Sequence, residues 1–143
     1  MKKFLLMFVV VLVAATSYAQ EVPQDSLSDY ELGIDLILEG RYEEGIDCLN
    51  KEVRKDPTNG NAILWIAYAR YELDQYDKAL IAADDAIRFI SKEEVGLKAY
   101  AHSIRAEIHM GLGDTKATLK DYTAAIKLSG DPSYFCKRGE FYY

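Results

Sequence analysis

The cysteines are the residues of this sequence that most directly invite a chemical role. Cys48 lies in the stretch GRYEEGIDCLNKEVRKDPTN, residues 40–59. A catalytic thiolate needs a nearby histidine or helix N-terminus to lower its pKa, whereas the neighbours Glu44 and Asp47 carry negative charge that disfavours the thiolate. We therefore interpret Cys48, and likewise Cys136, as small packing residues.

The histidines are the candidate metal ligands. His102 and His109 lie on one expected helix with Glu107 between them. Their spacing corresponds to about 10.5 Å along a helix axis, whereas a zinc–histidine bond is about 2.0–2.1 Å. One ion cannot bind both side chains, so we expect two histidines in or near the core and no metal site.

Other catalytic signatures are missing from the sequence. It has no glycine-rich phosphate loop and no serine nucleophile elbow. The adjacent Asp84 and Asp85 point in different directions on a helix and cannot share a proton. The sequence therefore predicts a protein with no catalytic residue and no cofactor.

The first 19 residues have the pattern of a cleaved secretory signal peptide. Two lysines precede an apolar run from Phe4 to Ala15, and the small residues Ser17 and Ala19 precede the expected cleavage point. The run is shorter than the roughly 20 residues that a membrane-spanning helix needs, and no lipoprotein cysteine follows it. Since the Lys-Lys start and the YAQ end resemble exported proteins of the Bacteroides type, we expect a periplasmic or secreted protein that is not a lipoprotein.

The charge of the chain excludes one class of partner. The formal net charge is −6, and removal of Lys2 and Lys3 with the signal peptide would make it −8. A chain this acidic repels phosphate backbones, so we expect no nucleic acid partner.

The elements that position these residues recur along the chain. EGRYEEGIDCLNKEVRKDP parallels LDQYDKALIAADDAIRFIS and LGDTKATLKDYTAAIKLSG. Small residues recur at intervals of 34, 39 and 33 residues, at Gly33, Ala67, Ala106 and Gly139. Twelve residues after the first three lie Gly45, Ala79 and Thr118. A period near 34 with small residues at fixed offsets indicates a repeat architecture.

Each repeat reads as a helical hairpin. In the first, apolar residues recur at helical spacing until Gly40, and a second helix from about Tyr42 ends at Asp56-Pro57. Glycine costs about 1 kcal/mol relative to alanine inside a helix. Gly33 and Gly45 therefore predict a close crossing at which the two helices face each other.

The chain resembles the tetratricopeptide repeat family over residues 26–143. The resemblance is carried in the repeat 26–59 by Leu32, Gly33, Leu36, Tyr42, Gly45, Leu49 and Pro57. It is carried in 60–93 by Ile63, Ile66, Ala67, Tyr76, Ala79 and Ala86, and in 99–131 by Ala106, Gly113, Tyr122, Ala125 and Ile126. The half repeat 132–143 adds Phe135, Arg138, Gly139 and Tyr142. The resemblance implies an all-α domain, residues 20–143, forming a right-handed superhelix of about three hairpins plus a terminal helix.

The sequence departs from the family pattern after the second repeat. Ser91 replaces the expected proline, and about five extra residues follow it. The segment SKEE fits a capping box, which predicts that the next helix begins near Lys92 and is long. Thr115 and Thr118 replace the usual tyrosine and alanine of the third repeat.

The resemblance also implies a binding surface. In the family the first helix of each repeat lines the concave face, where partners usually bind, and chaperone-tail adaptors have lysine and asparagine at the inward positions of the first repeat. Tyr30 and Ile34 stand there in this chain, so a chaperone-tail adaptor is not expected. Tyrosines suit peptide or protein recognition, although helical aromatic stripes also pack as core. The implied groove residues are Tyr30, Ile34, Asn61, Leu64, Tyr68, Tyr71, Tyr100, Glu107 and Met110.

The aromatic end of the chain supports an alternative hypothesis. The half repeat contains Phe135, Phe141, Tyr142 and Tyr143. Terminal repeats normally have a polar outer face, and an exposed apolar patch marks an interface. Besides a scaffold that binds a protein or peptide, the sequence is therefore compatible with a structural subunit that self-associates through its last helix.

Overall fold

The computed structural model describes residues 27–139, which form an array of α-helices. The helices are α2 (Asp29–Leu38), α3 (Tyr42–Lys55), α4 (Gly60–Glu72), α5 (Tyr76–Phe89), α6 (Val95–Gly111), α7 (Thr115–Ser129) and α8 (Pro132–Gly139). None of these helices has the length and apolar character needed to cross a membrane. The predicted signal peptide, residues 1–19, and Phe141, Tyr142 and Tyr143 lie outside the described residues.

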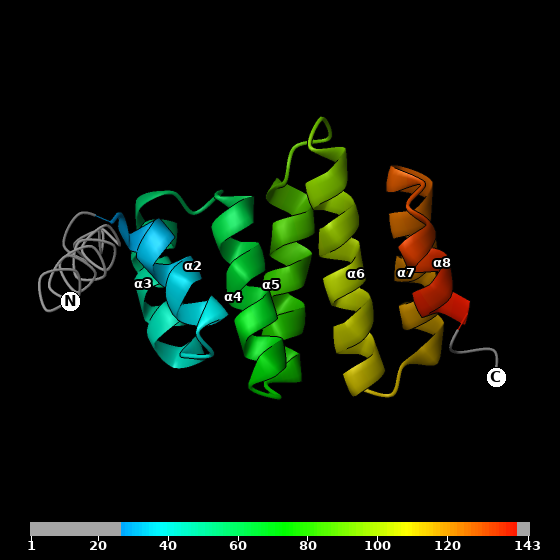
Figure 1. The fold of residues 1–143 in the computed structure, drawn as a ribbon, viewed down its shortest axis with the longest axis horizontal. Helices are drawn as coiled ribbons and strands as arrows, with labels where there is room; N and C mark the ends of the chain where they lie inside the picture. The colour runs from blue at the N-terminus through cyan, green and yellow to red at the C-terminus, as the bar shows by residue number, and fades with distance from the viewer. Residues whose placement is uncertain (1–26, 140–143) are drawn as a thin grey trace, which may run out of the picture.

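The helices pack as consecutive hairpins. α2 packs on α3, α4 on α5, and α6 on α7, while α3–α4, α5–α6 and α7–α8 contacts join each hairpin to the next. Figure 1 shows the helices side by side along the long axis of the molecule, with α2 and α3 at one end and α7 and α8 at the other. Because α4 also contacts both α2 and α6, the first helices of the hairpins form one continuous layer, which we call the first-helix layer.

Short-range hydrogen bonds define several helix ends. At α2, the N–H of Glu31 donates to Oγ of Ser28 at 3.2 Å, and the N–H of Ser28 donates to Oε2 of Glu31 at 3.0 Å, which is a capping box. Asn59 accepts from the N–H of Ala62 at 3.0 Å, and Asp114 accepts equivalently at the start of α7. These side chains satisfy N–H groups that have no partner inside the helix.

The turn inside each hairpin uses the same backbone conformation. Gly40 and Gly113 have φ values of +81° and +76°, and Asp74 has a φ of 56° at the corresponding place in the second hairpin. The left-handed region favours glycine and is tolerated by aspartate. One residue at each turn therefore reverses the chain in the same way.

The prediction for the start of α6 is wrong. Ser91 Oγ donates to the carboxylate of Glu93, and the N–H of Glu94 donates to the carbonyl oxygen of Ser91 at 3.2 Å. These bonds form a turn in place of a capping box, so α6 begins at Val95 and not near Lys92. Once started, α6 runs for 17 residues, the greatest length among the described helices.

The close crossing predicted at Gly33 and Gly45 is confirmed. A Cβ atom on Gly45 would lie 2.5 Å from Cγ1 of Ile37 and 2.8 Å from the carbonyl oxygen of Gly33, and one on Gly33 would lie 2.7 Å from Cγ of Leu49. The equivalent residues of the later hairpins are fully buried: Ala67 and Ala79, and Ala106 and Thr118. A small side chain at each crossing lets the two backbones approach.

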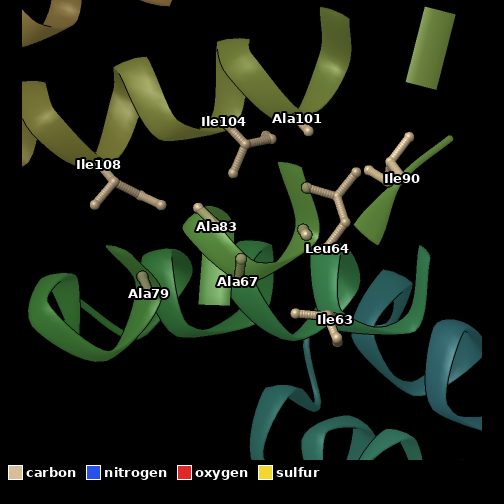
Figure 2. Close-up of a cluster of buried hydrophobic side chains, with 10 residues drawn as sticks. Ile63, Leu64, Ala67, Ala79, Ala83, Ile90, Ala101, Ile104 and Ile108 are labelled. Carbon is tan, nitrogen blue, oxygen red and sulfur yellow. The ribbon is translucent and has the colours of Figure 1, made fainter. Parts of the chain in front are cut away.

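The buried core continues between hairpins. Its main cluster joins α4, α5 and α6, and Figure 2 shows Ile104 and Ile108 of α6 directed toward the α4–α5 hairpin, where Ala67 and Ala83 lie. A second cluster, including Ile37, Leu49 and Ile66, joins α2, α3 and α4. Each hairpin is therefore stabilised largely by apolar contact with its neighbours, as in other repeat proteins.

The two cysteines have different environments. Cys48 is buried on α3, as predicted, and both cysteines are free thiols. Cys136 is exposed, so its interpretation as a buried packing residue is wrong. The cause is the position of α8, which packs against α7 but buries none of its own described residues fully.

The glycine crossing predicts the effect of adding one methyl group. We expect Gly45→Ala to lower the free energy of unfolding by about 1–3 kcal/mol, because the new Cβ overlaps Ile37 and the Gly33 carbonyl. Gly96 on α6 has no neighbour within 4 Å of its built Cβ, so Gly96→Ala should raise the same quantity by up to about 1 kcal/mol. Urea unfolding followed by circular dichroism measures both, and equal effects of the two substitutions would contradict the close crossing.

Candidate functional site

The candidate site is the surface of the first-helix layer. Tyr30 and Ile34 lie half-buried on α2, and Asn61, Tyr68 and Tyr71 lie half-buried on α4. On α6, Tyr100 and Met110 are each 41% exposed, and Glu107 is half-buried. The prediction that Leu64 lines the groove is wrong, because its side chain is only 2% exposed and packs in the main core cluster.

A glutamate that the sequence analysis missed lies at the centre of the tyrosines. Tyr42, from the start of α3, donates its hydroxyl to Oε2 of Glu72 at 3.4 Å. Burial, together with the negative charge of Glu72, raises the pKa of Tyr68 to about 12. Burial is the largest cause of the raised pKa of Tyr71 and of Tyr100, and the Glu72 carboxylate adds to the rise in both. Glu72 therefore lies within electrostatic range of four phenols.

A second glutamate, Glu107 on α6, extends the cluster toward α8. The Tyr71 hydroxyl donates to Oε2 of Glu107 at 3.4 Å, and the ammonium of Lys137 forms an ion pair with Oε1. Lys137 also acts on Tyr100, since its positive charge partly offsets the rise in the pKa of that phenol that burial causes. We call the set Tyr42, Tyr68, Tyr71, Tyr100, Glu72 and Glu107 the tyrosine–glutamate face.

The rings of this face are held in place by their neighbours. Trp65 packs edge-on against Tyr68 with ring centroids 6.1 Å apart, and Tyr71 packs against Tyr76 at the same separation. Aromatic pairs at such distances are favourable in these orientations. The face therefore presents aromatic rings, phenol hydroxyls and two carboxylates at the surface of the first-helix layer.

The two histidines belong to a separate cluster on α6 and α7. His102 Nδ1 lies 3.0 Å from Oδ1 of Asp121, and His109 Nε2 lies 3.7 Å from Oδ2. Arg105 donates to both oxygens of Asp121, at 2.7 and 2.8 Å, and to Asp84 of α5 at 2.6 Å. Within residues 27–139, no group of three or more acidic, histidine or cysteine side chains is arranged to hold a metal ion.

The buried carboxylate of Asp121 joins three helices electrostatically. Asp121 is only 3% exposed. Burial raises the pKa of its carboxyl group, but the hydrogen bonds from His102 and Arg105 outweigh burial, so the pKa lies below its ordinary value of 3.8. Through these contacts the cluster connects α5, α6 and α7.

A depression on another part of the surface lies between α3, α4 and α5. It encloses about 340 Å³ and has the apolar lining residues Val53, Ile63, Ile66 and Ile81, with Arg70, Lys78 and Asp85 at its polar part. Two of its polar lining residues have partners from their own part of the chain: Asp85 forms an ion pair with Arg88, and Arg70 donates a hydrogen bond to Gln75.

Comparison with known proteins agrees with the helical-repeat architecture. No family model matches the chain. Over 73 residues the chain is 37% identical to a TPR repeat-containing protein of Methanocaldococcus jannaschii, a match that covers 49% of this chain and 13% of that relative.

Solved structures of other proteins have a similar fold. The second TPR domain of human RPAP3, in complex with the HSP70 peptide SGPTIEEVD, is similar with a TM-score of 0.72 and 20% identity, over 81% of this chain and 93% of that one. The first TPR of Spaghetti (RPAP3), bound to the HSP90 peptide SRMEEVD, gives 0.71 and 22%, over 78% and 86%. These likenesses establish an all-α helical-repeat protein made of stacked hairpins. The stacked hairpins have the fold of tetratricopeptide repeat domains, as the sequence predicted, and a stretch of 73 residues is similar in sequence to a TPR repeat-containing protein.

The Asp121 cluster predicts a pH-dependent loss of stability. We expect Asp121→Asn to lower the free energy of unfolding at pH 7 by about 3 kcal/mol, because Arg105 loses a buried counter-charge and His102 loses a carboxylate hydrogen-bond partner. Since the folded-state pKa of Asp121 is lowered, its contribution is complete above the ordinary value of 3.8 and disappears as the pH falls through the folded-state value. Urea unfolding at several pH values measures the difference.

Asp84→Asn is the matched control, since Asp84 is an exposed partner of the same arginine. It should cost less than about 1 kcal/mol. Equal costs for the two substitutions, or a cost for Asp121→Asn that does not change below pH 4, would contradict the structural role of Asp121.

Proposed function

We propose that the protein is a non-catalytic scaffold that binds a segment of another protein, or a peptide, on the tyrosine–glutamate face. The observation that supports this most strongly is the continuity of the face. Each of its phenols is within electrostatic range of Glu72, and Glu107 joins the same set through Tyr71. Half-exposed tyrosines supply contact area and a polar tip, which interfaces use repeatedly.

The fixed geometry of the rings favours binding. Hydrogen bonds hold the hydroxyls of Tyr42 and Tyr71, and Trp65 packs on the ring of Tyr68. A ring that is already held loses little conformational entropy when a partner covers it. The similar domains of RPAP3 and Spaghetti (RPAP3) have peptides bound, which supports a peptide-binding role for this chain.

The proposal assigns the partner to the envelope or the exterior of a bacterial cell. Its basis is the predicted signal peptide, with two lysines, an apolar run and small residues before Gln20. The proposal assigns no catalytic step, because Cys48 is buried and the oxygens of Asp121 are engaged by Arg105 and His102.

A second candidate function is self-association through α8. Phe135 on this helix is 49% exposed, and the guanidinium of Arg138 lies 5.4 Å from its ring centroid. No residue described in α8 is fully buried. A second copy covering this face would bury the phenyl ring, and aromatic residues of this kind are frequent interface anchors.

The scaffold proposal predicts which side chains matter for binding. Peptides selected from a random 12-residue phage-displayed library should bind the purified chain, and Tyr68→Ala and Tyr100→Ala should each weaken binding at least about tenfold. Ile81→Ala, at an exposed apolar residue of α5 in the other layer, is the control and should have no effect. Fluorescence anisotropy measures the affinity and circular dichroism checks the fold. Unchanged affinity in both tyrosine variants would refute the proposed site.

The self-association candidate is tested by sedimentation equilibrium over a concentration series. The native chain should show a dimer, and Phe135→Ser should weaken dimer formation at least about tenfold by removing the aromatic anchor. Leu38→Ser, at an exposed leucine at the other end of the array, is the control and should leave the dimer intact. A native chain that is monomeric throughout the series would rule this candidate out.

A further inference from the structure

We propose that the tyrosine–glutamate face selects segments that carry lysine or arginine, and that Glu72 is the carboxylate that receives the cationic group. This inference rests on the proposed function, since it names the class of segment that the same face binds. The supporting observations are the Lys137–Glu107 ion pair within the chain, a second carboxylate on the same face without such a partner among the described residues, and the negative net charge of the sequence.

The chain itself places a lysine on this face. Lys137 comes from α8, thirty residues after Glu107 in the sequence, and its ammonium forms an ion pair with the Glu107 carboxylate. The opposite oxygen of Glu107 accepts the Tyr71 hydroxyl at 3.4 Å. The arrangement shows that a carboxylate, a phenol donor and neighbouring rings on this surface accommodate a primary ammonium.

Glu72 on α4 has no such ammonium partner among the described residues, and it is more exposed than Glu107. It is exposed, and Tyr42 donates a hydrogen bond to it at 3.4 Å. Among residues 27–139, no lysine, arginine or histidine forms an ion pair with Glu72. A cation from a partner would meet the carboxylate and also the faces of neighbouring tyrosine rings, where cation–π attraction adds to the ion pair.

The net charge of the chain favours a cationic partner over an acidic one. The whole sequence has a formal net charge of −6, which attracts basic segments and repels acidic ones at moderate salt. The peptides bound by the RPAP3 and Spaghetti (RPAP3) domains, SGPTIEEVD and SRMEEVD, both contain the acidic sequence EEVD. Glu72, which has no ion-pair partner among the described residues, would oppose such a sequence, so this face is suited to the opposite charge.

The test begins with selection and ends with two matched charge changes. A random 12-residue phage-displayed library is selected against the full chain in 50 mM salt, and we expect lysine and arginine to be enriched among the bound peptides. One selected peptide is then synthesised with its basic residues and again with glutamine in their place. We expect the glutamine peptide to bind the native chain about five- to tenfold more weakly, in fluorescence anisotropy.

Glu72→Gln should weaken binding of the basic peptide by about the same factor. It should also remove the difference in affinity between the basic and the glutamine peptide, because the change in the protein and the change in the peptide delete the same interaction. Asp47→Asn removes one exposed carboxylate from α3, in the other layer, and should leave the difference intact. Lys137→Gln removes the ion-pair partner of Glu107, so it should raise the affinity for the basic peptide about two- to fivefold. Circular dichroism checks that each variant is folded.

The contradicting outcomes separate the inference from the proposed function. Selected peptides that lose binding in Tyr68→Ala but show no basic enrichment would overturn charge selection and leave the binding site standing. Basic peptides that respond equally to Glu72→Gln and Asp47→Asn would overturn the role of Glu72, because net charge alone would explain them. An unchanged affinity in Lys137→Gln would overturn the equivalence of Lys137 and a partner's lysine. Failure to select any peptide, or selected peptides insensitive to Tyr68→Ala, would overturn both proposals.

Discussion

The close approach of two helices inside each hairpin is the constraint on which the rest of this structure depends. At Gly33 and Gly45, a single additional carbon would overlap a neighbouring side chain or carbonyl oxygen. The corresponding positions in the next two hairpins have fully buried small residues. Because the three hairpins pack against one another in sequence order, their first helices form one continuous layer. Tyrosines from α4 and α6 can then share one pair of carboxylates, although they are distant in sequence.

Much of the architecture could be predicted because its signals are local and recur. The small residues at Gly33 and Gly45 repeat at a fixed offset, and Asp56-Pro57 ends the helix that begins at Tyr42, as a proline just after a helix commonly does. The start of α6 was missed for a specific reason. Ser91 has a choice of acidic neighbours, and it bonds to Glu93 in a turn instead of capping a helix. Asp74 has a positive φ at the turn where the other two hairpins have glycine, and only alignment of the repeats suggests this conformation for an aspartate.

The candidate site was predictable where helix register decides it and not where side chains cross between hairpins. Tyr68, Tyr71, Tyr100 and Glu107 follow from the repeat frame. Leu64 lies on the same helical stripe as Tyr68 and Tyr71 but is buried in the core cluster that joins α4, α5 and α6, and helix register alone does not distinguish it from them. The contacts Tyr42–Glu72 and Lys137–Glu107 each span thirty residues, and no periodic pattern encodes which side chains meet at that separation. The same holds for Asp121, whose partners His102 and Arg105 lie on the preceding helix.

The chain shares its fold with peptide-binding domains but has a negative net charge. Peptides ending in EEVD are bound by the similar domains of RPAP3 and Spaghetti (RPAP3), whereas the first-helix layer of this chain presents Glu72 and Glu107 among phenols. The most direct test of the central claim is a map of backbone amide shifts in a ¹⁵N-labelled chain titrated with a selected lysine-containing peptide. The account predicts that the shifts concentrate on α4 and α6 around Glu72, Tyr68 and Tyr100. Shifts concentrated on α3, α5 and α7, with α4 and α6 unperturbed, would contradict it.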